Sequence, residues 1–487
     1  MTGVEEKLSS LNPVPCGTRR TSGFGFSRFS GRLFVAAVAL ICLFSPRVQI
    51  WTGIAFVLVA YIFVDFSQNS SNGIQLVDIT LLIAGMQWFI LAHFVYLSQD
   101  SFNARRMMQV SEGKYMFNTL LAYVGYWMGM KLFAPKLILW ERETRTSEMF
   151  WNIAIKIGVI LFVANFIFPS FITNMGIWII TGYLLKNICR TSSPKGYIWA
   201  LVVVDVYMLV RSVISSMFHQ LLLLLLMQFL FITVIRKISG KKVCLLILAG
   251  MMLINVIQVS KSQYRASMDQ YGVTGRVGVF HQLFWDNIQN MFSSDGYEEY
   301  PLARYNQGWL ISYVYIHEDG EFHAEKLPKF VESLTAIVLP RFLMPNKRLA
   351  GGRDNINDFT DLVLDEETSM NISTVGEGYA YFGRYGNFFF HFIIGSIFAG
   401  VLQLLMHWEK LYGVGVFCIP AIFSLAIRAE SDCMTGYNAL LKMLLLFAVI
   451  LWYCNVRMRR RGNPERDHGH FANGSGGSAK GAEDIQV

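Results

Sequence analysis

The chain has 487 residues, of which 53% are hydrophobic and 16% charged, and its formal net charge is +8. A soluble domain with this composition could not keep its surface wet, so the sequence excludes an ordinary soluble protein and predicts a bilayer as the solvent. The basic residues form short clusters beside the apolar runs, which is typical of topology anchors rather than of a nucleic-acid surface. The seven cysteines have no paired spacing, and the sequence predicts no disulfide framework, no metal site and no cofactor.

Apolar runs of about 20 residues, the length a helix needs to cross the hydrocarbon core, follow one another along the chain. They predict an all-α, polytopic transmembrane bundle of about twelve spans. The first run is expected to be a retained span rather than a signal peptide. The expected spans are residues 32–44, 48–66, 74–98, 115–138, 149–168, 171–187, 197–215, 217–235, 243–260, 387–407, 411–428 and 438–456.

Two of the apolar runs are too long for one span. Residues 197–235 would form a helix about 58 Å long, nearly twice the thickness of the hydrocarbon core, so we expect a break near Ser215, Ser216 and His219. Residues 149–186 carry Pro169 near their centre, where proline interrupts helical hydrogen bonding. Each run is therefore predicted to form two spans.

Clusters of Lys and Arg indicate which side of the membrane each loop faces, because basic loops stay in the cytoplasm. With about twelve spans the basic clusters fall on one side, which predicts that both termini are cytoplasmic. The expected organisation is a basic cytoplasmic segment (1–31), a transmembrane bundle (32–260), a large periplasmic loop (261–386), the C-terminal spans (387–456) and a Gly/Ser-rich cytoplasmic tail (457–487).

The large loop has helical periodicity. Val277, Phe280, Phe284 and Ile288 recur at spacings of three and four, which predicts an amphipathic helix, and residues 324–343 show a similar pattern. We therefore expect a folded helical cap rather than a disordered connector.

Cations are concentrated in and beside this loop, against the usual bias toward the cytoplasm. A charge within a span indicates a functional site by default, and guanidinium groups bind phosphate oxygens bidentately, so the set predicts a site for a phosphate-bearing, membrane-embedded ligand. For each cation alone, a salt bridge or a lipid headgroup is the alternative partner, and Glu430 and Asp432 are local alternatives for Arg428. The cations are Arg211, Arg265, Arg276, Arg304, Arg341, Lys347, Arg348, Arg353 and Arg428.

Glu377 lies in a glycine-rich stretch just before the helix expected to form the tenth span. Small neighbours let backbones approach closely, so we expect its carboxylate to face a site at the membrane surface. The alternatives are that it caps the first turn of that helix or pairs with Arg384.

About residues 330–390 resemble the carboxy-terminal signature of bacterial Wzy-type O-antigen and exopolysaccharide polymerases. In that signature a Pro-Arg-Pro-Lys segment precedes a Gly-Glu-x-Tyr-x-x-Phe-Gly-x-x-Gly element that enters a transmembrane helix. The plan of many spans with one large, late outer loop is similar too. The matching residues are Pro340, Arg341, Pro345, Lys347, Gly376, Glu377, Tyr379, Phe382, Gly383 and Gly386.

The resemblance implies a metal-independent glycosyltransferase of the GT-C class in the bacterial inner membrane. It would join undecaprenyl-diphosphate-linked oligosaccharide units into O-antigen or exopolysaccharide, surrounded by membrane lipid and working beside a chain-length regulator and a flippase. Arg341 and Glu377 would be catalytic, with Glu377 orienting or deprotonating the acceptor hydroxyl and His219 and His281 as alternative bases. Substrate would contact Arg211, Arg265, Arg276, Arg304, Lys347, Arg353, Tyr379 and Arg428.

Other functions stay open on the sequence. An O-antigen ligase-like transferase would use the same chemistry with a different acceptor. A transporter or flippase for a lipid-linked sugar would show internal symmetry, interrupted helices and a site at the membrane midplane. A non-catalytic membrane assembly factor is the third alternative.

Overall fold

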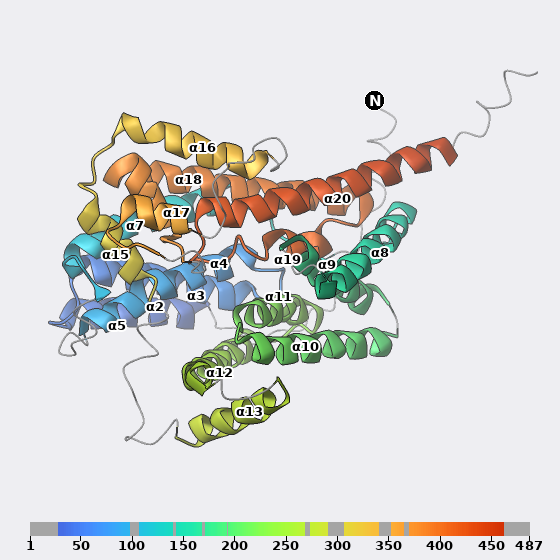
Figure 1. Ribbon diagram of the computed structural model, residues 1–487, viewed down its shortest axis with the longest axis horizontal. Helices are drawn as coiled ribbons and strands as arrows, with labels where there is room; N and C mark the ends of the chain where they lie inside the picture. Colours follow the sequence, from blue (N-terminus) through green and yellow to red (C-terminus); the bar gives the residue numbers. More distant parts are fainter. Residues whose placement is uncertain are drawn as a thin grey trace, which may run out of the picture.

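The computed structural model describes residues 28–97, 107–139, 143–167, 171–191, 193–267, 273–290, 306–339, 352–364 and 370–461, and this part of the chain is all-helical without a strand (Figure 1). The helices are α2 (Arg28–Phe44), α3 (Ile50–Asn69), α4 (Leu76–Gly85), α5 (Leu91–Leu97), α7 (Glu112–Phe133), α8 (Arg145–Ile167), α9 (Phe171–Arg190), α10 (Lys195–Ser215), α11 (His219–Ile235), α12 (Gly240–Ser267), α13 (Val273–Asn290), α15 (Gly308–His317), α16 (Leu327–Val338), α17 (Arg353–Phe359), α18 (Ser373–Tyr412), α19 (Ile419–Phe423) and α20 (Cys433–Arg461). Three short elements complete the list: the π-helix η1 (Met86–Ile90) and the 3-10 helices η3 (Ala324–Lys326) and η4 (Val416–Cys418).

Long apolar helices make this a membrane-embedded protein. Within the described residues, 7 helices are long and apolar enough to cross a bilayer, and two shorter apolar helices, Phe29–Phe44 and His219–Ile235, accompany them. The expected number of about twelve spans is not confirmed. The long helices are α3, the continuous α4–η1–α5 rod, α8, α10, α12, α18 and α20.

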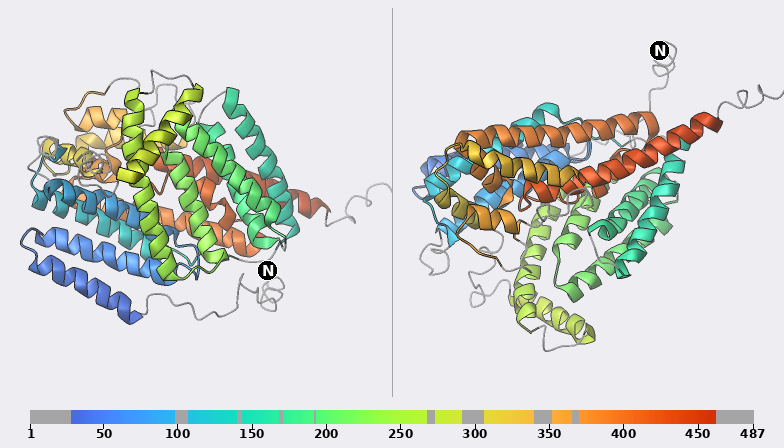
Figure 2. Two further views of the ribbon diagram at one scale, coloured as in Figure 1. Left: turned by 90° about the horizontal axis from the view of Figure 1, so that it is seen from below. Right: turned by 45° about the horizontal axis from the view of Figure 1, so that its top comes forward.

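The helices form two groups (Figures 1 and 2). In one group α7 packs against α3, α4 and α18, and α16 lies against α20. In the other, α10 to α13 pack together and are joined to the rest through α9 and through contacts of α12 with α3. Figure 2 shows α2 at the edge of the molecule, where it packs on α3. Large aromatic side chains are fully buried in the first group, among them Trp88 of η1 and Tyr115 and Tyr123 of α7.

Glycines set the closest helix contact. A Cβ atom on Gly125 or Gly129 of α7 would lie 2.2 Å from a carbonyl oxygen of α18, that of Phe388 or Phe392. Helix backbones approach this closely only where small residues line the contact. The seam between α7 and α18 therefore depends on these two positions.

The expected breaks in the long apolar runs are confirmed. α10 ends at Ser215, Ser216 adopts a left-handed conformation with φ of 53°, and α11 begins at His219. The run 149–186 likewise forms two helices, because α8 and α9 pack against each other; Pro169 itself lies outside the described residues. The two helices predicted in the large loop are also present, as α13 and α16.

The helix α18 consists of two pieces joined at Gly383, which has φ of 70° and ψ of −175°. The following amide, that of Arg384, donates a hydrogen bond of 2.7 Å to the carbonyl of Gly320, so the cap holds the kink. Glu377 therefore lies inside the first piece of α18, where the sequence placed it just before a helix. The expected domain boundaries at 260/261 and 386/387 both fall inside helices, α12 and α18.

The expected span 411–428 is wrong as a continuous helix. After Tyr412 the chain turns at Gly413, which has φ of 70°, and then forms only η4 and α19 before irregular turns lead to α20. The carboxylate of Glu409 explains the turn, because it accepts hydrogen bonds from the Val416 amide at 3.1 Å and from Arg190 at 2.7 Å. Residues 413–432 are called the interrupted span below.

The cap consists of α15, α16 and α17. Phe330 of α16 packs against Tyr381, Phe382 and Phe390 of α18, with ring centroids 4.8 to 6.0 Å apart. This contact covers the kink of α18 and brings the cap next to the start of α20. The large loop is therefore folded onto the bundle, as its periodicity predicted.

Candidate anion-binding site

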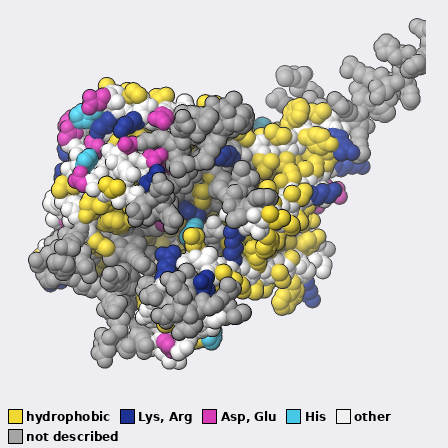
Figure 3. All heavy atoms as spheres, in the orientation of Figure 1, with side chains coloured by type: hydrophobic (Ala, Val, Ile, Leu, Met, Phe, Trp, Pro, Cys, Tyr) yellow, Lys and Arg dark blue, Asp and Glu magenta, His cyan; other side chains and the backbone are white. Residues whose placement is uncertain are grey.

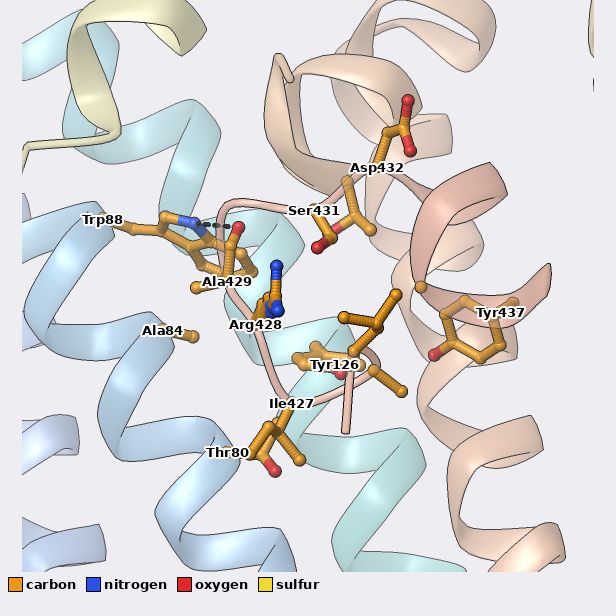
Figure 4. A pocket seen from close by; sticks show the side chains of 14 residues that line it. Thr80, Ala84, Trp88, Tyr126, Ile427, Arg428, Ala429, Ser431, Asp432 and Tyr437 are labelled. Atoms are coloured by element: carbon orange, nitrogen blue, oxygen red, sulfur yellow. Dashed lines mark hydrogen bonds between the residues drawn. The ribbon is translucent and has the colours of Figure 1, made fainter. Parts of the chain in front are cut away.

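A small pocket lies beneath the cap, between α4, η1, α7 and the end of the interrupted span (Figure 4). Aromatic rings and hydroxyl groups form its walls, and one guanidinium group lies within it. The lining residues are Thr80, Ala84, Trp88, Tyr126, Thr374, Leu425, Ala426, Ile427, Arg428, Ala429, Ser431, Asp432, Gly436 and Tyr437.

Arg428 is the cation of this pocket. Its side chain is half-buried and its Nε atom is fully buried, and across the described chain the guanidinium donates no hydrogen bond and forms no salt bridge. Glu430 acts on it only through longer-range attraction. Because a charged side chain within a membrane protein normally has a partner, the free donors of Arg428 indicate a site for an anion.

Local backbone contacts hold Arg428 in place. Its amide bonds to the Leu425 carbonyl at 3.2 Å, and its carbonyl accepts from the Ser431 amide at 3.4 Å. The next carbonyl, that of Ala429, accepts from Trp88 Nε1 at 3.2 Å and from Ser373 Oγ at 2.6 Å. Trp88 lies in η1, and π-helical turns of this kind occur frequently at functional sites.

Two further cations, Lys261 and Arg265, lie in the C-terminal part of α12, near the end of α10 and the start of α11. The imidazole of His219, at the start of α11, faces the positive charges of Arg428 and Lys261. Arg265 of α12 donates to Oγ of Ser216 at 3.0 Å and to its carbonyl at 3.3 Å, which closes the end of α10. We call Lys261, Arg265 and Arg428 the cation cluster. Figure 3 shows Lys and Arg side chains gathered in the middle of one face.

Other predicted phosphate ligands lie farther along the same helices or on the cap. Arg211 is on α10, and Arg276 of α13 faces Tyr264 of α12. Arg353 is the first residue of α17, 4.0 Å from the carboxylate of its neighbour Asp354. Arg304, Arg341 and Lys347 lie outside the described residues.

Glu377 is buried, with 1% of its surface exposed. Its Oε2 accepts a hydrogen bond of 2.7 Å from the amide of Cys433, the first residue of α20. The carboxylate thus caps a helix, as one sequence alternative stated, but the helix is α20 and not its own. Arg384, the other expected partner, lies against the hydroxyl of Tyr379 instead.

Tyr379 is 1% exposed, and its ring lies 4.4 Å from that of Tyr315, centroid to centroid. In this arrangement both tyrosines belong to the contact between α15 and α18. A sugar cannot stack on the ring of Tyr379, because neighbouring side chains cover that ring almost completely.

Trp88, Tyr126 and Lys261 were not singled out from the sequence. Trp88 and Tyr126 look like ordinary members of apolar spans, and Lys261 like a helix-end anchor. Besides Arg428 itself, the sequence signal for the pocket is the pair Gly413 and Gly415 with Pro420 inside an apolar run, a composition that disfavours an unbroken helix.

The described part of the chain contains no group of three or more His, Cys, Asp or Glu side chains that could hold a metal ion. Comparison with family models, with curated proteins and with solved structures finds no match for the chain. Fold and site therefore define a helical, membrane-embedded protein. In its small pocket lies a half-buried arginine whose guanidinium has no partner among the described residues.

Proposed function

We propose that the chain is a GT-C-type membrane glycosyltransferase that polymerises undecaprenyl-diphosphate-linked oligosaccharide units at the periplasmic face of the bacterial inner membrane. The resemblance of about residues 330–390 to Wzy-type polymerases suggests the reaction. The guanidinium of Arg428, which has no partner among the described residues and lies in a small pocket, supports it most directly, because such a charge can bind a diphosphate.

The cation cluster suits the leaving group of this reaction. A diphosphate gains negative charge as the glycosyl bond breaks, and fixed cations in a water-poor site stabilise that charge more in the transition state than in the ground state. Arg428 has free donors for this purpose, and Lys261 lies close enough to act on the same neighbour, His219. Arg341, Lys347 and Arg304 stay in the proposal as additional phosphate ligands.

In the proposed step, a hydroxyl oxygen of the acceptor unit forms a bond to the anomeric carbon of the growing chain. The bond between that carbon and the diphosphate oxygen breaks, and its electron pair stays on the diphosphate. The hydroxyl proton passes to a ring nitrogen of a histidine or to a carboxylate.

His219 is the best placed of the three candidate bases. Its ring makes no hydrogen bond to a described residue and it faces Arg428. By contrast, Nε2 of His281 accepts from Trp285 Nε1 at 2.9 Å, and Glu377 is engaged with the Cys433 amide. We therefore assign the proton transfer to His219 in place of Glu377.

Purified protein in liposomes tests the proposal. Supplied with lipid-linked units from a strain that lacks the gene, the protein is expected to produce a ladder of chain lengths, and Arg428→Met is expected to abolish it. Arg457→Met is the matched control, because this arginine is exposed near the other end of α20 and bonds only Tyr453 Oη, at 3.2 Å. Absence of a ladder with the unchanged protein refutes the polymerase. Transfer of a whole glycan to a different acceptor identifies a ligase.

The interrupted span favours a second candidate, a transporter of lipid-linked oligosaccharide. Discontinuous helices line the substrate sites of many transporters, and here a short helix of five residues, α19, stands in the place of a full span. Movement of an intact, fluorescent lipid-linked sugar across the liposome membrane without chain extension would support this candidate over the polymerase.

The proposed orientation places both termini in the cytoplasm and residues 261–386 in the periplasm. Reporter fusions within that range are expected to be active only as periplasmic reporters. Cytoplasmic activity would place the site on the wrong side for a polymerase.

A further inference from the structure

The segment that follows Arg428 is held by side chains from three other elements. Trp88 of η1 and Ser373 of α18 both donate to the Ala429 carbonyl. Glu377 of α18 accepts from the Cys433 amide at 2.7 Å, and Asn355 of α17 donates to Oδ2 of Asp432 at 3.1 Å. We call Asn355, Glu377, Trp88 and Ser373 the clamp, and Figure 4 shows the contact of Trp88 with Ala429.

The position of the guanidinium depends on this clamp. Arg428 makes no side-chain hydrogen bond of its own within the described chain, so its place in the pocket follows from its backbone. Four residues separate it from the Cys433 amide, and the carboxylate of Asp432 accepts from the Thr435 amide at 2.8 Å, which begins α20. Fixing the start of α20 therefore fixes the backbone that carries the cation.

The clamp residues are buried and one is strained. Asn355 is 5% exposed and Glu377 is 1% exposed. Ser373 has φ of 63°, a conformation that costs a residue other than glycine about 1–3 kcal/mol and persists only where surrounding contacts hold it. Strain of this kind is often found beside functional sites.

We propose that Asn355 and Glu377 are positioning residues for Arg428, which hold its guanidinium at the place where a diphosphate binds. The inference rests on the proposed function for the identity of the ligand. It gives Glu377 a role that differs from proton transfer, and it makes the cap helix α17 part of the binding apparatus, because Asn355 donates to the carboxylate of Asp432 beside the site.

The probe for this role is farnesyl diphosphate, a short lipid diphosphate, titrated into the full-length protein in nanodiscs by calorimetry. Asn355→Leu removes the donor to Asp432 and is expected to weaken binding about tenfold, the usual scale for loss of an orienting hydrogen bond. Glu377→Gln keeps the shape and an acceptor oxygen, so a smaller loss of affinity is expected. Arg428→Met is expected to eliminate measurable binding.

Asn357→Leu is the matched control on the same helix, because its side chain accepts only from the Leu364 amide, at 3.2 Å, away from the clamp. It is expected to bind like the unchanged protein. Melting temperatures separate positioning from folding: a structural role would lower the melting temperature without changing the affinity of the folded fraction.

Unchanged affinity in Asn355→Leu, or equal losses in Asn355→Leu and Asn357→Leu, would overturn the positioning role and leave the proposed function intact. Failure of the unchanged protein to bind farnesyl diphosphate would overturn both proposals.

Discussion

Two arginines mark the two ends of the interrupted span, and their surroundings are opposite. Arg190 is 1% exposed and bonds Glu409 Oε1 at 2.7 Å and the Gly413 carbonyl at 2.8 Å. Arg428 lies half-buried in a pocket with its guanidinium unpartnered among the described residues. An arginine at one end of the interrupted span is therefore part of an ion pair that stabilises the fold, and we call this the closed end. The arginine at the other end has no counter-charge among the described residues, and we call this the open end.

The difference teaches how to separate a structural charge from a functional one. A buried ion pair with complete hydrogen bonding contributes through its geometry, and removing one partner leaves an uncompensated charge. A charge without a partner contributes nothing of this kind to folding. The presence of such a charge indicates a ligand that binds after the protein has folded.

The largest expected effect on stability is at the closed end. Glu409→Leu leaves Arg190 buried without its counter-charge, and we expect the free energy of unfolding to fall by about 3–5 kcal/mol. Thermal unfolding in detergent, followed by tryptophan fluorescence, measures the loss. The double variant Arg190→Met with Glu409→Leu should regain most of it, and a single variant as stable as the unchanged protein would contradict the pairing.

The turn between the ends gives a smaller effect. Gly413 has φ of 70°, so Gly413→Ala places a Cβ atom in a left-handed conformation at a cost of about 1–2 kcal/mol. Gly400→Ala is the control. Gly400 lies in α18, the helix that ends at this turn, and a Cβ atom there would meet nothing within 4 Å. Equal melting temperatures for the two variants would show that the turn is not what interrupts the span.

At the open end we expect no loss of stability. Arg428→Met removes a poorly solvated charge that has no partner, so the variant should melt at the temperature of the unchanged protein or slightly above it. The same variant should lose diphosphate binding. A fall comparable to that of Glu409→Leu would instead make Arg428 a second structural arginine.

A small effect that depends on pH is expected at an exposed carboxylate in the cap. Bonds from the Glu321 amide at 2.8 Å and from His323 hold the pKa of Asp319 below its usual value of 3.8. A depressed pKa stabilises the fold above the unfolded pKa, and this contribution disappears as the pH falls through the folded pKa. Asp319→Asn should lower the melting temperature slightly at pH 7, and the difference should shrink steadily as the pH is lowered below 3.8. A difference that does not shrink on acidification would contradict this assignment.

Local signals in the sequence predicted most of the helices. Length alone located the break between Ser215 and His219, and apolar spacing located α13 and α16. The apolar pattern did not predict the break in the interrupted span. Apolar composition indicates that residues are buried, and a buried turn is as apolar as a buried helix. Only Gly413, Gly415 and Pro420 distinguished it.

The candidate site was predictable in part. Charge bias singled out Arg428 and its neighbours, because a cation within a span is unusual. The partner of Glu377 could not be found in this way, since the Cys433 amide lies 56 positions along the chain and carries no side-chain signal. A contact between a carboxylate and a backbone amide far away in the sequence can be predicted only once the whole fold is known.

The glycine seam of α7 and α18 has a consequence for the backbone of the pocket. Tyr126, one of the lining residues, stands on α7 and follows directly after Gly125. Because peptide groups rather than rotatable side chains meet at the seam, a change of rotamer cannot alter the spacing of the two helices beside Tyr126. The backbone on this side of the pocket is thus fixed when the two helices dock.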